Sequence, residues 1–211
     1  NLIELMPTIG FVQTYGQTEC SPRVTALLPN DSRKKIGSVG KPIPGVSVKV
    51  VADDGKELNN NCIGEILVKG QNVMKGYYKF DDLNATVISD GWLHTGDLGY
   101  FDEDEYLYLT GRKKNIIISC GINIYPEEIE QIMLQYQGIK EVCVVGEDDE
   151  LKGEVPVAYI VKNEEIEITE LREFCLENLA HYKVPARFIF IEQLPKTYNG
   201  KIKRNGNGEK I

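Results

Sequence analysis

Short stretches of hydrophobic residues, separated by turn-forming residues, fill the first half of the chain. Residues 46–51 (VSVKVV) and 64–69 (GEILVK) each predict a strand, and a turn at 53–55 (DDG) follows the first of them. Residues 106–109 (YLYL) come after an acidic turn at 102–105 and predict another strand. Short strands joined by frequent turns indicate a small β-barrel or an antiparallel sheet.

The hydrophobic pattern changes at about residue 115. Residues 116–119 and 122–125 flank Gly121 and predict a hairpin. Pro126 suits the first position of a helix, and two Glu in the first turn complement the helix dipole. This helix carries one apolar stripe and is predicted to end at Gly138. The stripe consists of Ile129, Ile132, Met133 and Tyr136.

Strands at 142–145, 155–161 and 188–191 follow, together with a second helix that Thr169 can cap. The order of strand, helix and strand predicts a compact α+β domain of roughly one hundred residues. A seam is expected near residues 111–115, where Arg112, Lys113 and Lys114 stand together. The predicted fold class is therefore α+β, with a β-rich portion before the seam.

Composition narrows the functional classes. The chain has 24 Lys and Arg against 32 Asp and Glu, a formal charge of −8, which disfavours general nucleic-acid binding. The five Cys form no CxxC pair and only two His accompany them, so neither a zinc site nor a disulfide framework is expected. Reduced thiols predict a cytoplasmic protein. No apolar run approaches the ~18 residues of a transmembrane segment.

Residues 14–19 (TYGQTE) place a ring, a glycine, a hydroxyl and a carboxylate close together. Tyr15 could stack on a base, and Gly16 would let the backbone approach a ligand. Thr18 could bond a phosphate oxygen, and Glu19 could bind Mg²⁺. Taken alone, the segment is explained better by a turn with a packed tyrosine.

Three further segments carry polar groups suited to a nucleotide. Asp97 in DGWLHTGDL (90–98) is expected on a Gly-flanked loop, where it could accept hydrogen bonds from a ribose diol. Arg112 in TGRKK (110–114) offers a planar fork of donors. Lys201 in PKTYNGKIKR (195–204) projects from an Asn-Gly turn and could stabilise developing negative charge. A solvated basic turn and a solvated C-terminal tail are the alternatives for the last two.

Together these segments, in this order, resemble the AMP-forming acyl-CoA synthetases, a superfamily that also holds luciferase-like enzymes and peptide-synthetase adenylation domains. The resemblance runs over nearly the whole chain. Its segments are YGQTE (15–19), IGSVGKPIPG (36–45), GEILVKGQNVMKGYY (64–78), DGWLHTGDLGYFDEDEYLYLTGRKKNIII (90–118), SCGINIYPEEIE (119–130) and LPKTYNGKIKR (194–204).

The resemblance implies an enzyme that joins a carboxylate to AMP from ATP and passes the acyl group to a thiol. It places Tyr15 at the adenine, Gly16 among the nucleotide-binding residues, Thr18 at the phosphate and Glu19 at Mg²⁺. Asp97 is expected to bind the ribose hydroxyls, with Arg112 assisting. Lys201 resembles the lysine that stabilises charge during adenylation.

The resemblance also implies movement of a lid domain between the two half-reactions. Lys114 looks like the hinge, and Gly121 looks like the residue that lines the path of the pantetheine arm. The implied organisation is the end of the AMP-binding large domain with its small β-barrel portion (1–111), a hinge (112–115) and a mobile C-terminal α+β domain (116–211).

GINIYPEEIE is closer to the CoA-ligase form of this segment, and only seven residues follow Arg204, so free coenzyme A is the expected acceptor. The expected partners are a small carboxylic acid, ATP and CoA, with a homodimer left open. The family's phosphate loop has no counterpart here. We therefore expect a C-terminal portion, inactive alone, that needs the remainder of the enzyme upstream.

Three alternatives remain from the sequence. One is an adenylation enzyme that loads a carrier protein, and another is a non-catalytic nucleotide-binding module. The third is a structural lid that partners a separately encoded N-terminal half. The carboxylic acid itself, whether fatty, aryl or other, is not specified by these residues.

Overall fold

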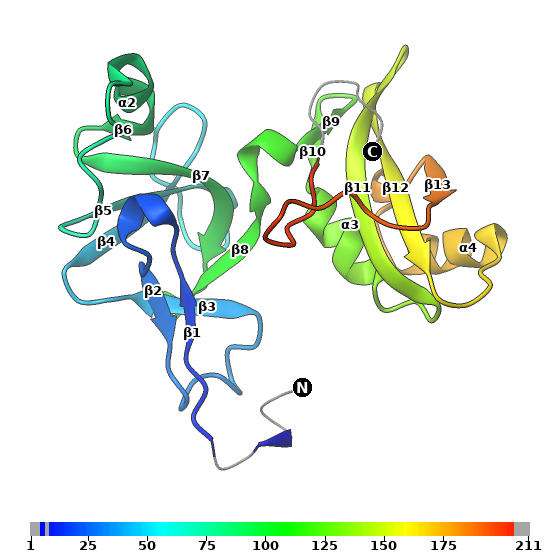
Figure 1. The fold of residues 1–211 in the computed structure, drawn as a ribbon, viewed down its shortest axis with the longest axis horizontal. Coiled ribbons are helices and arrows are strands. Elements are labelled where there is room, and N and C mark those ends of the chain that lie inside the picture. Colours follow the sequence, from blue (N-terminus) through cyan, green and yellow to red (C-terminus); the bar gives the residue numbers. More distant parts are fainter. Residues whose placement is uncertain (1–4, 7–8, 205–211) are drawn as a thin grey trace. The chain divides into compact units, whose positions relative to one another are not determined.

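The computed structural model describes residues 5–6 and 9–204 and divides the chain into two compact units (Figure 1). The first unit ends at Thr110 and the second begins at Gly111. The hinge and domain boundaries expected from the sequence stay a prediction, and residues 1–4, 7–8 and 205–211 of those domains lie outside the described ranges. Within those ranges, every helix is too short or too polar to cross a membrane.

An eight-stranded antiparallel sheet forms the first unit, with strand order β1-β2-β3-β8-β7-β5-β4 and β6 paired to β7. Its elements are β1 (Gln13–Tyr15), a 3₁₀ turn (Thr18–Cys20), β2 (Thr25–Leu27), β3 (Ser38–Pro42), β4 (Val46–Val51), β5 (Gly64–Gly70), α2 (Asp81–Val87), β6 (Ile88–Ser89), β7 (Trp92–Phe101) and β8 (Leu107–Arg112).

The small barrel expected for this unit is not confirmed. In the part of the chain that the structure describes, the strand order is open, and β1 and β4 are its two ends. The strands expected at 46–51 and 64–69 are confirmed as β4 and β5, whose alternating residues build one buried cluster. That cluster contains Tyr15, Cys20, Val24, Val39, Val50, Ile66, Val68, Leu93 and Leu107.

A five-stranded sheet and two helices form the second unit, which is α+β as expected. Strand order is β10-β9-β12-β11, and β13 runs parallel to β12. Its elements are a 3₁₀ turn (Lys113–Asn115), β9 (Ile117–Ser119), β10 (Ile122–Ile124), α3 (Pro126–Met133), β11 (Ile139–Asp149), β12 (Gly153–Lys162), α4 (Ile168–Asn178), a 3₁₀ turn (His181–Lys183) and β13 (Arg187–Phe190).

Two details of the helices correct the expectations. Helix α3 begins at Pro126 as expected but ends at Met133, and Gly138, at φ +91°, closes the turn that follows. Helix α4 is not capped by Thr169. Its N-cap is Glu167, which makes no side-chain capping bond, and Thr169 lies inside the first turn. The burial of the apolar stripe stabilises this short helix more than its cap does.

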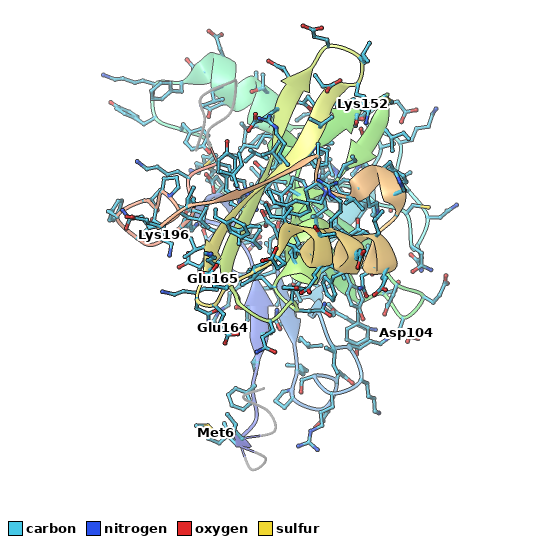
Figure 2. The ribbon with its side chains drawn as sticks, turned by 90° about the vertical axis from the view of Figure 1, so that its right-hand side faces the viewer. Met6, Asp104, Lys152, Glu164, Glu165 and Lys196 are labelled. Atoms are coloured by element: carbon cyan, nitrogen blue, oxygen red, sulfur yellow. The ribbon has the colours of Figure 1, made fainter. Side chains whose placement is uncertain are left out.

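Both faces of the second sheet are covered. Helices α3 and α4 pack on one face through Ile129, Met133 and Leu171, which are fully buried. Alternate residues of β12, such as Val157 and Tyr159, point to the opposite face. There the segment after β13 covers them with Leu194 and Ile202, and Figure 2 labels Lys196 on this segment.

Candidate functional site

The segment TYGQTE forms the end of β1 and a tight turn after it. Tyr15 closes β1, and a 3₁₀ turn then carries an exposed Thr18 and a half-buried Glu19. Gly16 is required by internal packing, since a Cβ there would lie 1.8 Å from the carbonyl oxygen of Pro22. Backbone crowding therefore fixes the turn that presents Thr18 and Glu19.

Asp97 lies on a bulge of strand β7 and not on the loop expected from the sequence. Leu67 pairs with His94 and Glu65 pairs with Leu98, so three residues of β7 face a single residue of β5. Gly96 adopts φ +68° at this point. Such a bulge redirects side chains locally, and the Asp97 backbone N–H is held by Thr95 Oγ1 at 3.0 Å.

The fold brings Tyr15 and Asp97 together. The Tyr15 hydroxyl donates a 2.8 Å hydrogen bond to Asp97 Oδ2, although the two residues are 82 positions apart. Both are buried, with 8% and 7% of their surface exposed. Burial and the neighbouring Asp97 carboxylate raise the pKa of Tyr15 well above its ordinary value. The phenol therefore stays protonated and orients the carboxylate.

A second tyrosine holds the Glu19 carboxylate. Tyr77 donates a 2.7 Å hydrogen bond to Glu19 Oε1, and this bond together with burial raises the pKa of Tyr77. Asn84 of helix α2 fixes the backbone of Tyr77, accepting from its N–H at 2.6 Å and donating to its carbonyl at 2.9 Å. The Met74 N–H also bonds the Glu19 carbonyl at 2.8 Å. Glu19 is therefore oriented by residues 74–84.

Other predicted site residues belong to the second unit. Arg112 and Lys114 are exposed, Arg112 at the end of β8 and Lys114 in the 3₁₀ turn that follows. Cys120 and Gly121 form the two-residue loop of the expected hairpin, at φ +50° and +78°. A Cβ on Gly121 would meet no atom within 4 Å, so one side of this loop is open.

Lys201 lies at the end of a tight turn after Leu194. Lys196 and Ile202 form an antiparallel bridge, and the Thr197 N–H bonds the Lys201 carbonyl at 2.7 Å. Gly200 adopts φ +82°, which confirms the Asn-Gly turn expected there. The Lys201 side chain is exposed. Residues 196–202 are called the lysine hairpin below.

Sequence reasoning missed several residues that orient this site. Tyr77 and Asn84 gave no signal of their own, because their role depends on a contact over 58 positions and on an unpredicted helix. Arg204 was noted only as one cation of the tail. In the structure its guanidinium bonds Glu130 of α3 at 2.6 Å.

The first unit thus carries Tyr15, Asp97 and Glu19, and the α+β second unit carries the exposed lysine hairpin, the residue types expected of an adenylate-forming class of protein. Two family descriptions match the chain: AMP-binding enzyme over residues 2–78, and AMP-binding enzyme C-terminal domain over residues 128–201. The chain belongs to the AMP-binding enzyme family.

Curated relatives and solved structures agree with this assignment. The 2-succinylbenzoate–CoA ligase of Bacillus licheniformis is 44% identical over 194 residues, which cover 92% of this chain and 40% of that protein. The Bacillus subtilis ligase of the same name is 41% identical over 193 residues, again 40% of its length. This chain therefore spans about 40% of the length of these relatives.

The structure of o-succinylbenzoate CoA synthetase from Bacillus subtilis with its acyl-adenylate intermediate matches at a TM-score of 0.90 and 38% identity. The match covers 99% of this chain and 44% of that one. The same enzyme with ATP and magnesium ion matches at a TM-score of 0.88 and 39% identity, covering 95% of this chain and 42% of that one.

Proposed function

We propose that this chain is part of an ATP-dependent, AMP-forming acid–thiol ligase that converts a carboxylic acid to its coenzyme A thioester through an acyl-adenylate. The observation that carries the proposal is the buried Tyr15–Asp97 hydrogen bond, which holds a carboxylate in a fixed orientation beside the Thr18–Glu19 turn. Relatives that bear ligase names, and related structures with AMP, ATP and an acyl-adenylate, support it.

In the first step, a carboxylate oxygen attacks the α-phosphorus of ATP and the bond to pyrophosphate breaks. Asp97 would accept hydrogen bonds from the ribose hydroxyls while Tyr15 packs at the adenine and keeps Asp97 oriented. Thr18 and Arg112 would donate to phosphate and ribose oxygens. The Lys201 ammonium would stabilise the negative charge that grows on the phosphate oxygens.

The donor set also fits Mg²⁺. Glu19 is a single carboxylate whose Oε1 is engaged by Tyr77. Within the described ranges, no cluster of three or more His, Cys, Asp or Glu could hold a metal ion. Mg²⁺ is commonly held by one or two carboxylates together with substrate phosphates. Glu19 would therefore hold the ion, which neutralises phosphate charge when bound.

In the second step, the thiol sulfur attacks the acyl carbon, AMP leaves with the bonding electrons and the thiol proton passes to solvent. Gly121 would line the approach of the thiol, because the loop that carries it is open on the side where a Cβ would lie. Lys114 would serve as the hinge between the two steps, since it lies in a short exposed turn at the start of the second unit.

The first acid to test is 2-succinylbenzoate, which several relatives carry in their names. We expect a complete ligase, in which these residues replace the matching part of the Bacillus subtilis enzyme, to exchange pyrophosphate into ATP only when this acid is present. Addition of CoA should then release AMP. A folded hybrid that binds ATP but forms no adenylate from this acid or from a panel of aryl and fatty acids would contradict the proposal. Transfer to a carrier protein but not to CoA would reassign the acceptor.

Replacing Tyr77 with Phe should weaken Mg²⁺-dependent nucleotide binding roughly tenfold, because a hydrogen bond to a charged group contributes about 1.5–3 kcal/mol. Calorimetric titration of the complete ligase with MgATP measures the effect. Tyr78, which is 83% exposed, provides the matched control through Tyr78→Phe. Equal affinities in the two variants would show that Tyr77 does not orient Glu19.

We also infer a cytoplasmic location for this ligase. All five cysteines are free thiols, and the buried ones, Cys20, Cys143 and Cys175, each belong to a buried apolar cluster. Free thiols persist in a reducing compartment, which is also where ATP and CoA are available. A homodimer stays a prediction.

A further inference from the structure

The lysine hairpin has an ordered backbone but an exposed tip. The Lys201 N–H bonds Thr197 Oγ1 at 3.1 Å, and the Lys203 N–H bonds the Pro195 carbonyl at 2.8 Å. Tyr198 at the tip is fully exposed. Because side chains at the tip do not fix the hairpin to the domain, its orientation depends on the residues at its base.

Three contacts attach that base to the second unit. Leu194 and Ile202 pack on the face of the sheet opposite the helices. Lys196, labelled in Figure 2, forms a 2.6 Å ion pair with Glu141 of β11, and about two fifths of its side chain is exposed. The third contact is made by Arg204, which follows Ile202 by two residues. The side chain of Arg204 is four fifths buried.

Arg204 closes a ring of bonds with Glu130 and Val144. Its guanidinium donates to Glu130 Oε2 at 2.6 Å and to the Val144 carbonyl at 2.9 Å. Glu130 Oε1 in turn accepts the Val144 N–H at 2.6 Å. The side chain of Glu130 is only 12% exposed. Reaching both the Glu130 carboxylate and the Val144 carbonyl requires the planar fork of donors of a guanidinium, and a Lys ammonium could not supply that fork.

The ring lies at the outer edge of the sheet. β11 is the end strand, and Val144 pairs with Ala158 of β12 on its inner side. The ion pair therefore satisfies the backbone groups of Val144 that face away from β12. Since Glu130 belongs to α3 and Arg204 to the tail, the ring links the tail, the sheet edge and the helix.

The same helix contacts the turn that the sequence marks as a hinge. Glu127, one turn before Glu130, accepts a 3.0 Å hydrogen bond from the Asn115 side chain and lies 3.6 Å from Arg204. One guanidinium is thus shared by two carboxylates of α3, and one of these carboxylates holds the 113–115 turn. The base of the lysine hairpin and that turn are fixed to one short helix.

We propose that the Glu130–Arg204 pair is a positioning device for Lys201, which holds the lysine hairpin in the orientation needed for acyl-adenylate formation. This inference rests on the proposed function. The pair does not touch the reacting groups. The pair acts on Lys201 through residues 199–202. Its bond anchors the chain just after these residues to the edge of the sheet.

The structural part of the proposal is tested by hydrogen exchange on the complete ligase. In Arg204→Met and Glu130→Gln, the amides of Thr197, Lys201 and Lys203 should exchange roughly tenfold faster, while those of β12 stay protected. Lys203→Met is the matched control, because Lys203 is an exposed cation next to Arg204. Unchanged hairpin exchange, or equal loss of protection in β12, would overturn the proposal.

The functional part is tested in the complete ligase by separating the half-reactions. Arg204→Met should lower the rate of adenylate formation roughly tenfold or more and leave the transfer from supplied acyl-adenylate to CoA near wild type. Arg204→Lys should restore little, since it lacks the fork. Equal loss of both half-reactions would indicate a merely structural role. If Lys201→Ala is inactive in adenylation but Arg204→Met is not, this inference fails and the proposed function stands.

Discussion

Replacing Lys201 with Ala is expected to slow acyl-adenylate formation by roughly 10²–10³, the cost of removing one charge contact to the growing phosphate charge. The Lys201 side chain is exposed and its turn is held by backbone bonds, so the substitution should leave folding unaffected. The rate of pyrophosphate exchange in the complete ligase measures the effect. Thioester formation from supplied acyl-adenylate should continue, because the proposed role of the lysine is confined to the first step.

Lys203 provides a matched control for this experiment. It is exposed, carries the same charge and lies two positions away, but it follows the hairpin instead of closing its turn. Lys203→Ala should therefore keep the adenylation rate within a few-fold of wild type. Adenylate formation that survives in Lys201→Ala at the level of Lys203→Ala would remove the lysine from the mechanism.

Replacing Asp97 with Ala should weaken AMP binding roughly 100-fold, because two hydrogen bonds from a ribose diol to a charged acceptor are lost at about 1.5 kcal/mol or more each. The Tyr15 hydroxyl would also lose its buried partner, so the melting temperature should fall. Isothermal titration with AMP and thermal unfolding of the complete ligase measure the two effects.

The Tyr15→Phe variant separates the contribution that Asp97 makes by contacting the nucleotide from the contribution of Tyr15, which orients Asp97. This variant keeps the ring at the buried position but removes the 2.8 Å hydrogen bond. We expect AMP affinity to fall by no more than about tenfold, since a single orienting bond contributes about 1 kcal/mol. If Asp97→Ala and Tyr15→Phe weaken binding equally, Asp97 does not contact the nucleotide itself.

The sequence predicted best where a regular pattern met a simple turn. β4 alternates apolar and polar residues from Val46 to Val50, and the Cys120-Gly121 loop is a two-residue hairpin with its glycine in the expected place. The α+β class followed from the same regularity. In each case the local preference and the final packing favour the same conformation.

Prediction failed where long-range pairing overrides local signals. Two glycines, Gly96 and Gly99, interrupt β7 and made Asp97 look like a loop residue. The strand forms nevertheless because β5 and β8 lie on both sides of it, and Gly99 is needed where a Cβ would lie 2.3 Å from the Tyr108 carbonyl oxygen. The short strands left a barrel and an antiparallel sheet both open, because they do not specify whether the ends of a sheet meet, and the barrel that the resemblance implied is not confirmed.

Only part of the candidate site could likewise be predicted from the sequence. Residue types with obvious chemistry, such as Glu19 and Lys201, stand out in short segments. Tyr77, which bonds Glu19, and Arg204, which we propose positions Lys201, are recognisable only after folding, because each meets its partner across more than fifty positions. Nothing in the sequence around their partners, Glu19 and Glu130, predicts these two pairings.

The ring formed by Arg204, Glu130 and Val144 gives the end of the tail a second role, because it also bonds the edge of the sheet. An uncovered end strand is a template for pairing with a neighbouring molecule, and here Arg204 and Glu130 bond the outward-facing backbone groups of Val144, only a few residues along the tail from Lys201. A substitution that releases the tail from this ring would therefore also leave the Val144 N–H and carbonyl unpaired at the edge of the sheet, where a strand from another molecule could bond them.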